Sequence, residues 1–388
     1  VLVEQQPSLN EDIDAHTVTS LPEAYEVFTG VQENALTNIT VSDEYNEAMS
    51  SIARDLCQRN DHLLNETAST NISEATYNAS NQAKQNAQAA LRNESYYSAA
   101  SYCFDANIDL RNALLNDTSE EERALIRQGV IQDAQAYLDQ IQDREVTTMS
   151  DVEASIIVKE RLYQVLDEDT QEQRSTGYLV ERYDSAKAWS TFYNYSSENI
   201  ELDQDYLQQA CLSKLREAEE RVRYLDYIIS DIDQYQEELE DVQGVYRDED
   251  YTYCLFKSSQ LKAEANSIIT GRSITGQYQE AFVQDKLQIA KQQIAEQTSF
   301  FPILGYSYYT YAESLRTEQP GVAAVFTEYA SEFSALDMYF ESTDKRPVQF
   351  PEESGPLTCP VSEPRQDDTQ REYVLLARGV VNGISIMG

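Results

Sequence analysis

The sequence predicts a mainly α protein, an elongated bundle of long helices and helical hairpins with a small β/α remnant at its N-terminus. No proline occurs from Glu23 to Phe301 and glycine is sparse there, which favours helices because both residues interrupt them. From Leu202 to Gln243, apolar residues recur about every 3.5 residues, as in a helix with one long apolar seam. We expect one helix of roughly 60 Å here, capped by Asp203, ended by Gly244 and defining the long axis of the domain.

The first thirty residues differ from the rest. Residues 1–3 and 15–19 have the composition of short strands. Ser20 then precedes a predicted helix over 21–28, which has Pro22 in its first turn. We therefore assign this segment to a separate unit.

The long proline-free stretch divides into a series of helices. Ser119 with Glu122 and Ser150 with Glu153 have the spacing of capping boxes at two helix starts. We group the helices into an N-terminal region, 31–200, and a central bundle, 201–343. The predicted helices cover 43–68, 73–92, 94–115, 119–142, 150–168, 175–195, 203–243, 249–270, 276–298, 304–317 and 320–341.

The C-terminal region, 344–388, is expected to be a tether followed by an apolar segment. Residues 344–368 hold five of the nine prolines, which favours an extended chain. Residues 373–388 are apolar but too short and too polar to span a bilayer. We expect a docking strand or helix there, or the approach to a membrane anchor beyond residue 388.

The charge balance excludes two classes of partner. The chain has 68 Asp and Glu against 29 Lys and Arg, a net charge of -39. Nucleic acids and anionic membrane surfaces need a basic face, so we expect neither as a partner. A plain acidic surface and adaptation to a high-salt habitat both explain the acidity.

Glycosylation sequons indicate the compartment. Chance predicts about three Asn-x-Ser/Thr sequences in this composition, and the chain has seven, six of them before residue 120. They favour an extracellular or cell-surface glycoprotein, with chance enrichment as the alternative. The first ten residues lack the features of a signal peptide, so we expect a processed chain or a piece of a longer one. The sequons begin at Asn38, Asn65, Asn71, Asn78, Asn93, Asn116 and Asn194.

Five cysteines fit an oxidising compartment. Cys57 and Cys103 lie on two predicted helices, and so do Cys211 and Cys254, at separations that a helical hairpin can close. We predict these two disulfides, with buried free thiols as the alternative, and Cys359 is left over.

The cysteine helices echo one another. The helix carrying Cys57 leads to a Tyr-Cys-aromatic helix at Cys103, and the helix carrying Cys211 leads to a similar one at Cys254. A duplicated helical hairpin and coincidence in a tyrosine-rich bundle both explain this echo.

No catalytic, cofactor or metal site is expected. His62 lies five residues after Cys57, but a structural zinc needs four ligands, so we expect a surface histidine. Tyrosine, with 27 copies, gathers with Phe and Trp around 189–195 and 300–311. Such clusters either line a groove for sugar or polypeptide or simply pack helices together.

The start of the chain resembles a known family. Residues 1–3, 12–19 and the segment from Ser20 to the Phe-Thr-Gly ending at Gly30 resemble the last strand and helix of a Lon-type protease domain. The likeness is to the secreted Lon-like serine proteases of archaea, where a helical region follows. The resemblance covers residues 1–30 and implies that the nucleophilic Ser and its partner Lys precede this segment. It also implies assembly as a ring.

We therefore expect a non-catalytic extracellular domain, the oligomerisation or substrate-presenting region of a secreted Lon-like serine protease. The alternative is a free-standing cell-surface, filament or envelope protein. Expected partners are other proteins, further copies of the chain and N-linked glycans. Whether the chain belongs to an enzyme stays open, because the sequence itself contains no catalytic residues.

Overall fold

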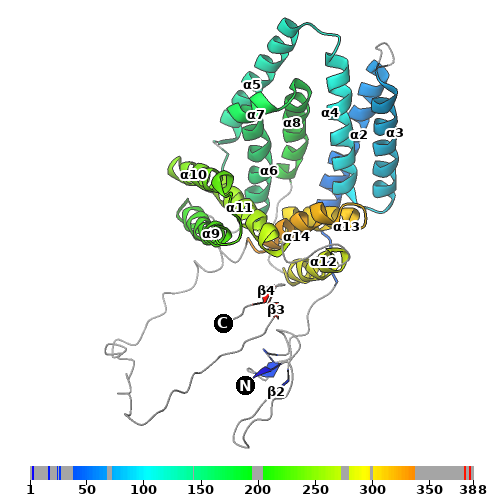
Figure 1. Cartoon of the computed structure of the whole chain (residues 1–388). Helices are drawn as coiled ribbons and strands as arrows, with labels where there is room; N and C mark the ends of the chain where they lie inside the picture. Colours follow the sequence, from blue (N-terminus) through cyan, green and yellow to red (C-terminus); the bar gives the residue numbers. More distant parts are fainter. Residues whose placement is uncertain are drawn as a thin grey trace, which may run out of the picture. The chain divides into compact units, whose positions relative to one another are not determined.

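The structure is a computed structural model, and it is mainly α, as the sequence predicts. Leu36–Phe340 forms one compact unit, and Val1–Ala35 with Glu341–Gly388 forms another. The structure describes residues 2–3, 16–17, 24, 26–27, 38–67, 72–142, 144–194, 204–271, 279–297, 300–336, 380–381 and 384–385. The helices of the larger unit (Figure 1) are α2 (Asp43–Thr67), α3 (Glu74–Arg92), α4 (Tyr96–Leu115), α5 (Glu120–Gln142), α6 (Met149–Leu166), α7 (Glu168–Gln173), α8 (Thr176–Trp189), the 3-10 helix η1 (Ser190–Asn194), α9 (Gln204–Leu225), α10 (Asp233–Arg247), α11 (Tyr251–Gly271), α12 (Gln279–Glu296), α13 (Ile303–Leu315) and α14 (Pro320–Ser334).

The smaller unit contains two short strand pairs in its described residues. β1 (Leu2–Val3) pairs in parallel with β2 (His16–Thr17), at both positions where the sequence predicts strands. β3 (Val380–Val381) pairs antiparallel with β4 (Ile384–Ser385) inside the apolar C-terminal segment. The predicted tether over 344–368 and the leftover Cys359 lie outside the described residues.

One of the two predicted capping boxes is confirmed and the other is wrong. Ser119 and Glu122 exchange hydrogen bonds at the start of α5. At α6 the box is instead formed two residues earlier, by Thr148 and Asp151. Glu153 is fully buried, and its carboxylate accepts hydrogen bonds from the backbone N–H groups at the start of α13. Sequence spacing cannot reveal a cap supplied by a distant helix, which is why this prediction failed.

The predicted single helix over 202–243 is also wrong. α9 ends at Leu225, α10 begins at Asp233, and α10 packs back against α9 and α11. The break falls where Ser230 and Asp231 weaken helix formation. Folding back buries Leu225 and Val242 within the bundle, whereas a straight helix would need a partner along its whole seam. Gly244 consequently lies inside α10 and does not end it.

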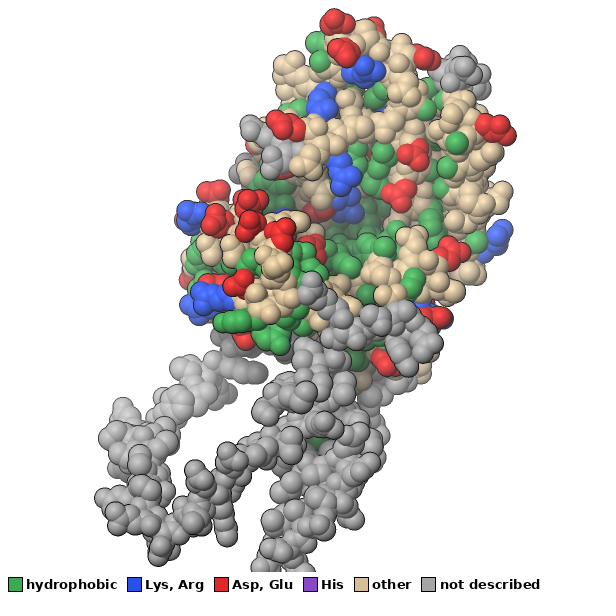
Figure 2. All heavy atoms as spheres, viewed as in Figure 1, with side chains coloured by type: hydrophobic (Ala, Val, Ile, Leu, Met, Phe, Trp, Pro, Cys, Tyr) green, Lys and Arg blue, Asp and Glu red, His purple; other side chains and the backbone are tan. Residues whose placement is uncertain are grey.

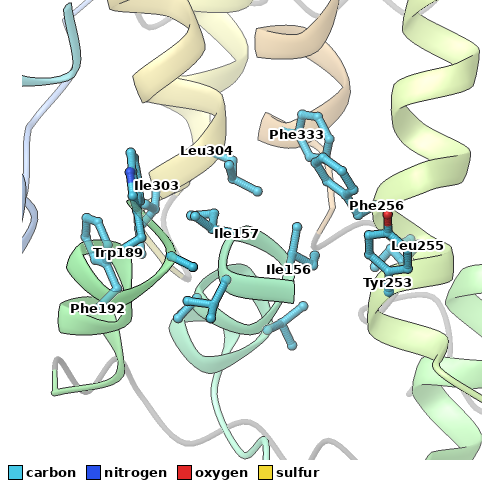
Figure 3. Close-up of a cluster of buried hydrophobic side chains, with 14 of the residues drawn as sticks. Ile156, Ile157, Trp189, Phe192, Tyr253, Leu255, Phe256, Ile303, Leu304 and Phe333 are labelled. Carbon is cyan, nitrogen blue, oxygen red and sulfur yellow. The ribbon is translucent and has the colours of Figure 1, made fainter. Parts of the chain in front are cut away.

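α6 is the element around which the larger unit packs. Every residue from Val152 to Glu160 is buried, so this helix is covered on all sides. Figure 3 shows Ile156 and Ile157 among side chains that come from α8, η1, α11, α13 and α14. Residues from both predicted helical regions therefore share one hydrophobic cluster.

The helices repeat one arrangement twice. We call residues 38–194 the first half and residues 204–336 the second half. In the first half α2 packs on α4, α4 and α5 pack on α8, and α6 packs on α5 and α8. In the second half α9 packs on α11, α11 and α12 pack on α14, and α13 packs on α12 and α14. Across the halves, α6 packs on α11 and α13 packs on α4, the reciprocal pattern that a twofold relation produces.

Sequence and backbone details mark equivalent positions. Thr327, Tyr329 and Glu332 in α14 repeat the spacing of Thr176, Tyr178 and Glu181 in α8. Among the described residues other than glycine, only two have positive φ: Glu94, at 58°, between α3 and α4, and Glu249, at 62°, between α10 and α11. The echo between the cysteine helices is thus part of a repeated arrangement of six helices.

Candidate functional site: paired carboxylate clamps, twin clefts and exposed sequons

Both predicted disulfides are present. Cys57 to Cys103 joins α2 and α4 with a Cα to Cα distance of 5.1 Å, and Cys211 to Cys254 joins α9 and α11 at 5.6 Å. The bond in the second half is fully buried, because both of its cysteines have no exposed surface. The bond in the first half borders an open pocket of 200 Å³, and Cys57 is only half-buried.

A buried carboxylate ties together three helices of the first half. The side chain of Glu181 in α8 is only 1% exposed. Arg59 of α2 donates from Nη2 to its Oε1 at 2.8 Å, and Arg111 of α4 donates from Nε to the same oxygen at 3.0 Å. Burying a carboxylate is costly unless it is paired and hydrogen-bonded, and here two cations supply the pairing.

The second half has a matching arrangement at the matching position. Glu332 of α14 lies 2.7 Å from Nζ of Lys214 in α9 and 2.9 Å from Nζ of Lys262 in α11. Burial lowers the pKa of Lys214. We call the two arrangements the glutamate clamps. Because cations from the first and third helices occupy each carboxylate, the clamps are suited to holding helices in place.

Further charged pairs connect α6 and α4 to α8. Arg182 donates from Nη2 to both carboxylate oxygens of Glu160, at 2.6 and 2.7 Å. The same guanidinium lies over the ring of Phe104, 5.7 Å from its centroid. Burial and the neighbouring Asp109 raise the pKa of Asp105 to about 6. Glu160 and Arg182 thus form an ion pair within the fold and have a structural role.

Most of the predicted aromatic clusters pack helices together. The ring of Tyr97 lies 5.7 Å from Trp189, 5.8 Å from Tyr308 and 5.6 Å from Tyr311, measured between centroids. On the face of the molecule that Figure 2 shows, there is a hollow between α4 and α8, and hydrophobic side chains form its floor. Tyr195, the last residue of one cluster, lies outside the described residues.

One cleft of 450 Å³ lies between the α3–α4 turn and α13. We call it the first cleft. Tyr102 of α4 and Tyr306 and Tyr309 of α13 line it, together with the polar side chain of Thr310. Asn93, a sequon asparagine, also lines this cleft.

Another cleft, of 610 Å³, lies between the α10–α11 turn, α6, the start of α9 and the residues from the end of α5 to Val146. We call it the second cleft. Lys159 lines it and donates to Asp250 at 2.6 Å and to Thr252 at 3.2 Å. The two clefts occupy equivalent places, because each lies between a positive-φ turn and the α6 or α13 helix. Asp248 ends α10 in the second cleft, as Asn93 ends α3 in the first.

The sequon asparagines differ from the other asparagines in exposure. Asn71 lies outside the described residues, and the other six sequon asparagines are all exposed: Asn38, Asn65, Asn78, Asn93, Asn116 and Asn194. The seven described asparagines outside sequons are all buried or half-buried: Asn46, Asn60, Asn81, Asn86, Asn107, Asn112 and Asn266. Position in the fold therefore separates the two sets completely. The sequence marks the sequons, but only the structure reveals this separation.

Neither histidine belongs to a metal-binding cluster among the residues that the structure describes. The side chain of His62 is 73% exposed and lies 3.4 Å from Oε1 of Glu66, one turn further along α2. His16 belongs to β2. Within the part of the chain that the structure describes, no three His, Cys, Asp or Glu side chains are grouped so that they could hold a metal ion.

Comparison of the chain with protein-family models, with curated proteins and with solved structures gives no match. Among the described helices, none combines the length and the hydropathy needed to cross a bilayer.

Proposed function

We propose that the helical unit is a non-catalytic, N-glycosylated domain that acts outside the cell by binding proteins or further copies of itself. The observation that carries this proposal is the split in exposure between the sequon asparagines and the other asparagines, which is complete among those that the structure describes. An oligosaccharide can be attached only to an asparagine at the surface. If the sequons had arisen by chance, some of their asparagines would be buried. Two disulfides also fit an oxidising compartment.

Within this class, we favour the accessory region of a secreted Lon-like serine protease. The likeness of residues 1–30 to the last strand and helix of a Lon-type domain supports this assignment. Clamps and disulfides hold several helices of each half together, and such a body can fix subunits in an assembly or present a substrate.

N-terminal sequencing and intact mass of the native protein, joined to the reading frame upstream of Val1, test this assignment. We expect a frame that encodes a Ser/Lys Lon domain and a mass above the 44.2 kDa of the polypeptide. A frame that encodes only a leader peptide contradicts the protease assignment. A chain without added mass contradicts the glycoprotein proposal.

A free-standing surface or envelope subunit is the second candidate. It is favoured by the antiparallel β3–β4 pair in the apolar C-terminal segment, since such a hairpin can add strands to a neighbour. Deleting residues 373–388 separates the two candidates. Loss of assembly in size-exclusion chromatography supports the surface subunit, and an unchanged oligomer supports the protease region.

A further inference from the structure

We propose that the N-glycan on Asn93 folds back into the first cleft and packs against the tyrosines there. This inference rests on the glycosylation proposed above and adds where one particular glycan lies. It assigns the first cleft to a carbohydrate that the chain itself carries.

The attachment point is held rigidly. Asn93 is the C-cap of α3, and its backbone N–H donates to the carbonyl of Ala89 at 3.2 Å. Glu94 follows with a φ of 58°, and the N–H of Ser95 donates to the carbonyl of Ala90 at 2.9 Å. A fixed turn reduces the entropy that the first sugar loses when it packs against protein.

The cleft has the chemistry that a sugar needs. Its volume of 450 Å³ lies within the range of small-molecule sites. Tyr102 and Tyr306 are half-buried and offer ring surface for the apolar C–H face of a sugar, and the hydroxyl groups of the three tyrosines can bond to sugar hydroxyls. Thr310 and Glu313 add further hydrogen-bonding groups along the same wall.

The second cleft supplies an internal comparison. Asp248 stands there in place of Asn93, so that cleft has no attached sugar. Its walls have the ion pair of Lys159 with Asp250 and a single tyrosine, Tyr251. The cleft with the sequon is thus the cleft with three tyrosines.

Mild periodate oxidation of the intact native glycoprotein tests the inference. Periodate cleaves the free vicinal diols of sugars, such as those of terminal residues, and site-resolved mass spectrometry of the glycopeptides reports each site separately. A glycan that is packed for about nine-tenths of the time reacts about tenfold more slowly, because protection follows the population of the packed state. We expect this protection at Asn93 but not at Asn78 or Asn116, and we expect it to vanish after denaturation. Equal rates at the three sites in the native protein overturn the inference.

A pair of tyrosine variants adds a matched control. Tyr102→Ala removes one wall of the cleft and should raise the oxidation rate at Asn93 to that at Asn78. Tyr77→Ala removes an exposed tyrosine beside another sequon and should leave the rate at Asn93 unchanged. Equal effects of both variants overturn the inference, and the rates in the unmodified sequence remain decisive if Tyr102→Ala fails to fold.

The two proposals fail in different ways. If no sequon carries a glycan, the glycoprotein proposal fails and this inference fails with it. If the other sequons are occupied while Asn93 is bare or unprotected, only the inference about the first cleft fails.

Discussion

The two halves of the helical unit share their internal contacts and differ in their surfaces. Each half has a disulfide between its first and third helices and a clamp whose glutamate lies on its last long helix. All seven sequons lie between Asn38 and Asn194, so the second half has none. The comparison teaches that the contacts between helices constrain the sequence here, while the outer faces are free to take on different roles. We locate the functional difference on those faces.

The clamps show the same division on a smaller scale. In the first half the cations are Arg59 and Arg111, with side chains 27% and 23% exposed. In the second half they are Lys214 and Lys262, and the side chain of Lys214 is only 2% exposed. The carboxylates show the opposite order, because the side chain of Glu181 is 1% exposed and that of Glu332 is 10% exposed.

Removing each clamp carboxylate gives the largest expected effect. Glu332→Ala leaves the buried Lys214 without its main partner and should lower the free energy of unfolding by about 3–5 kcal/mol. Glu181→Ala should cost less, about 2–3 kcal/mol, because water reaches Arg59 and Arg111 and screens their charges. Urea denaturation followed by circular dichroism measures both values.

A surface pair provides the control for the clamp variants. Glu219 pairs with Arg223 on an exposed face of α9, and Glu219→Ala should change stability by less than about 0.5 kcal/mol. Equal losses for Glu181→Ala and Glu332→Ala would contradict the difference in burial between the clamps.

The two disulfides should differ in how fast a reductant cleaves them. Cys57 borders an open pocket, whereas Cys211 and Cys254 are fully buried. Timed alkylation of the native protein in dithiothreitol should label Cys57 and Cys103 well before the other pair. Losing either bond should cost about 2–4 kcal/mol. Simultaneous labelling of all four thiols would show that reduction proceeds only through global unfolding.

Weakening the hydrogen bonds by which Glu153 links the two halves should lower stability by less than the loss of a clamp or a disulfide. Glu153→Gln keeps the size of the side chain but weakens the acceptor for the N–H groups of Ile303 and Leu304. We expect a loss of about 1–2 kcal/mol. Glu122→Gln, in the exposed capping box of α5, should cost less than about 1 kcal/mol. A reversed order in thermal denaturation would mean that the cap between halves contributes little.

The smallest prediction concerns pH. The pKa of Asp105 is raised to about 6 in the folded state, so the native protein holds this proton more tightly than the unfolded chain. The contribution of Asp105 to the free energy of unfolding therefore falls as the pH rises from about 4 to 6. Asp105→Asn should stabilise the protein at pH 7, by less than about 1 kcal/mol because water screens the group, and should change nothing near pH 3.5. A stability gain that is equal at both pH values contradicts this account.

Local signals in the sequence predicted much of the fold. Helix boundaries follow from caps such as Ser119 and from the missing prolines, and most lie within a few residues of the observed ends. Cysteine spacing predicted both disulfides, although each bond joins the first and third helices of its half, with another helix between them in the chain. The short α7 helix was missed, since six residues carry little periodicity.

Features that depend on distant residues were not predictable in the same way. The break between Leu225 and Asp233 lacks Pro and Gly, and α10 folds back because its seam packs on α9 and α11. The role of Glu153 needs a helix start 150 residues away. The clamps were missed too, although the shared Thr-x-Tyr-x-x-Glu spacing at Glu181 and Glu332 was a signal that a search for repeats can find.

Site-resolved glycopeptide mapping of the native protein from its source tests the central claim most directly. Mass spectrometry of peptides that contain each asparagine reports occupancy at every sequon. We predict sugar on the exposed sequon asparagines of the first half and none anywhere in the second half. Bare asparagines at all seven sequons would contradict the account of an extracellular glycoprotein. The proposed functional difference between the two halves would then have no support.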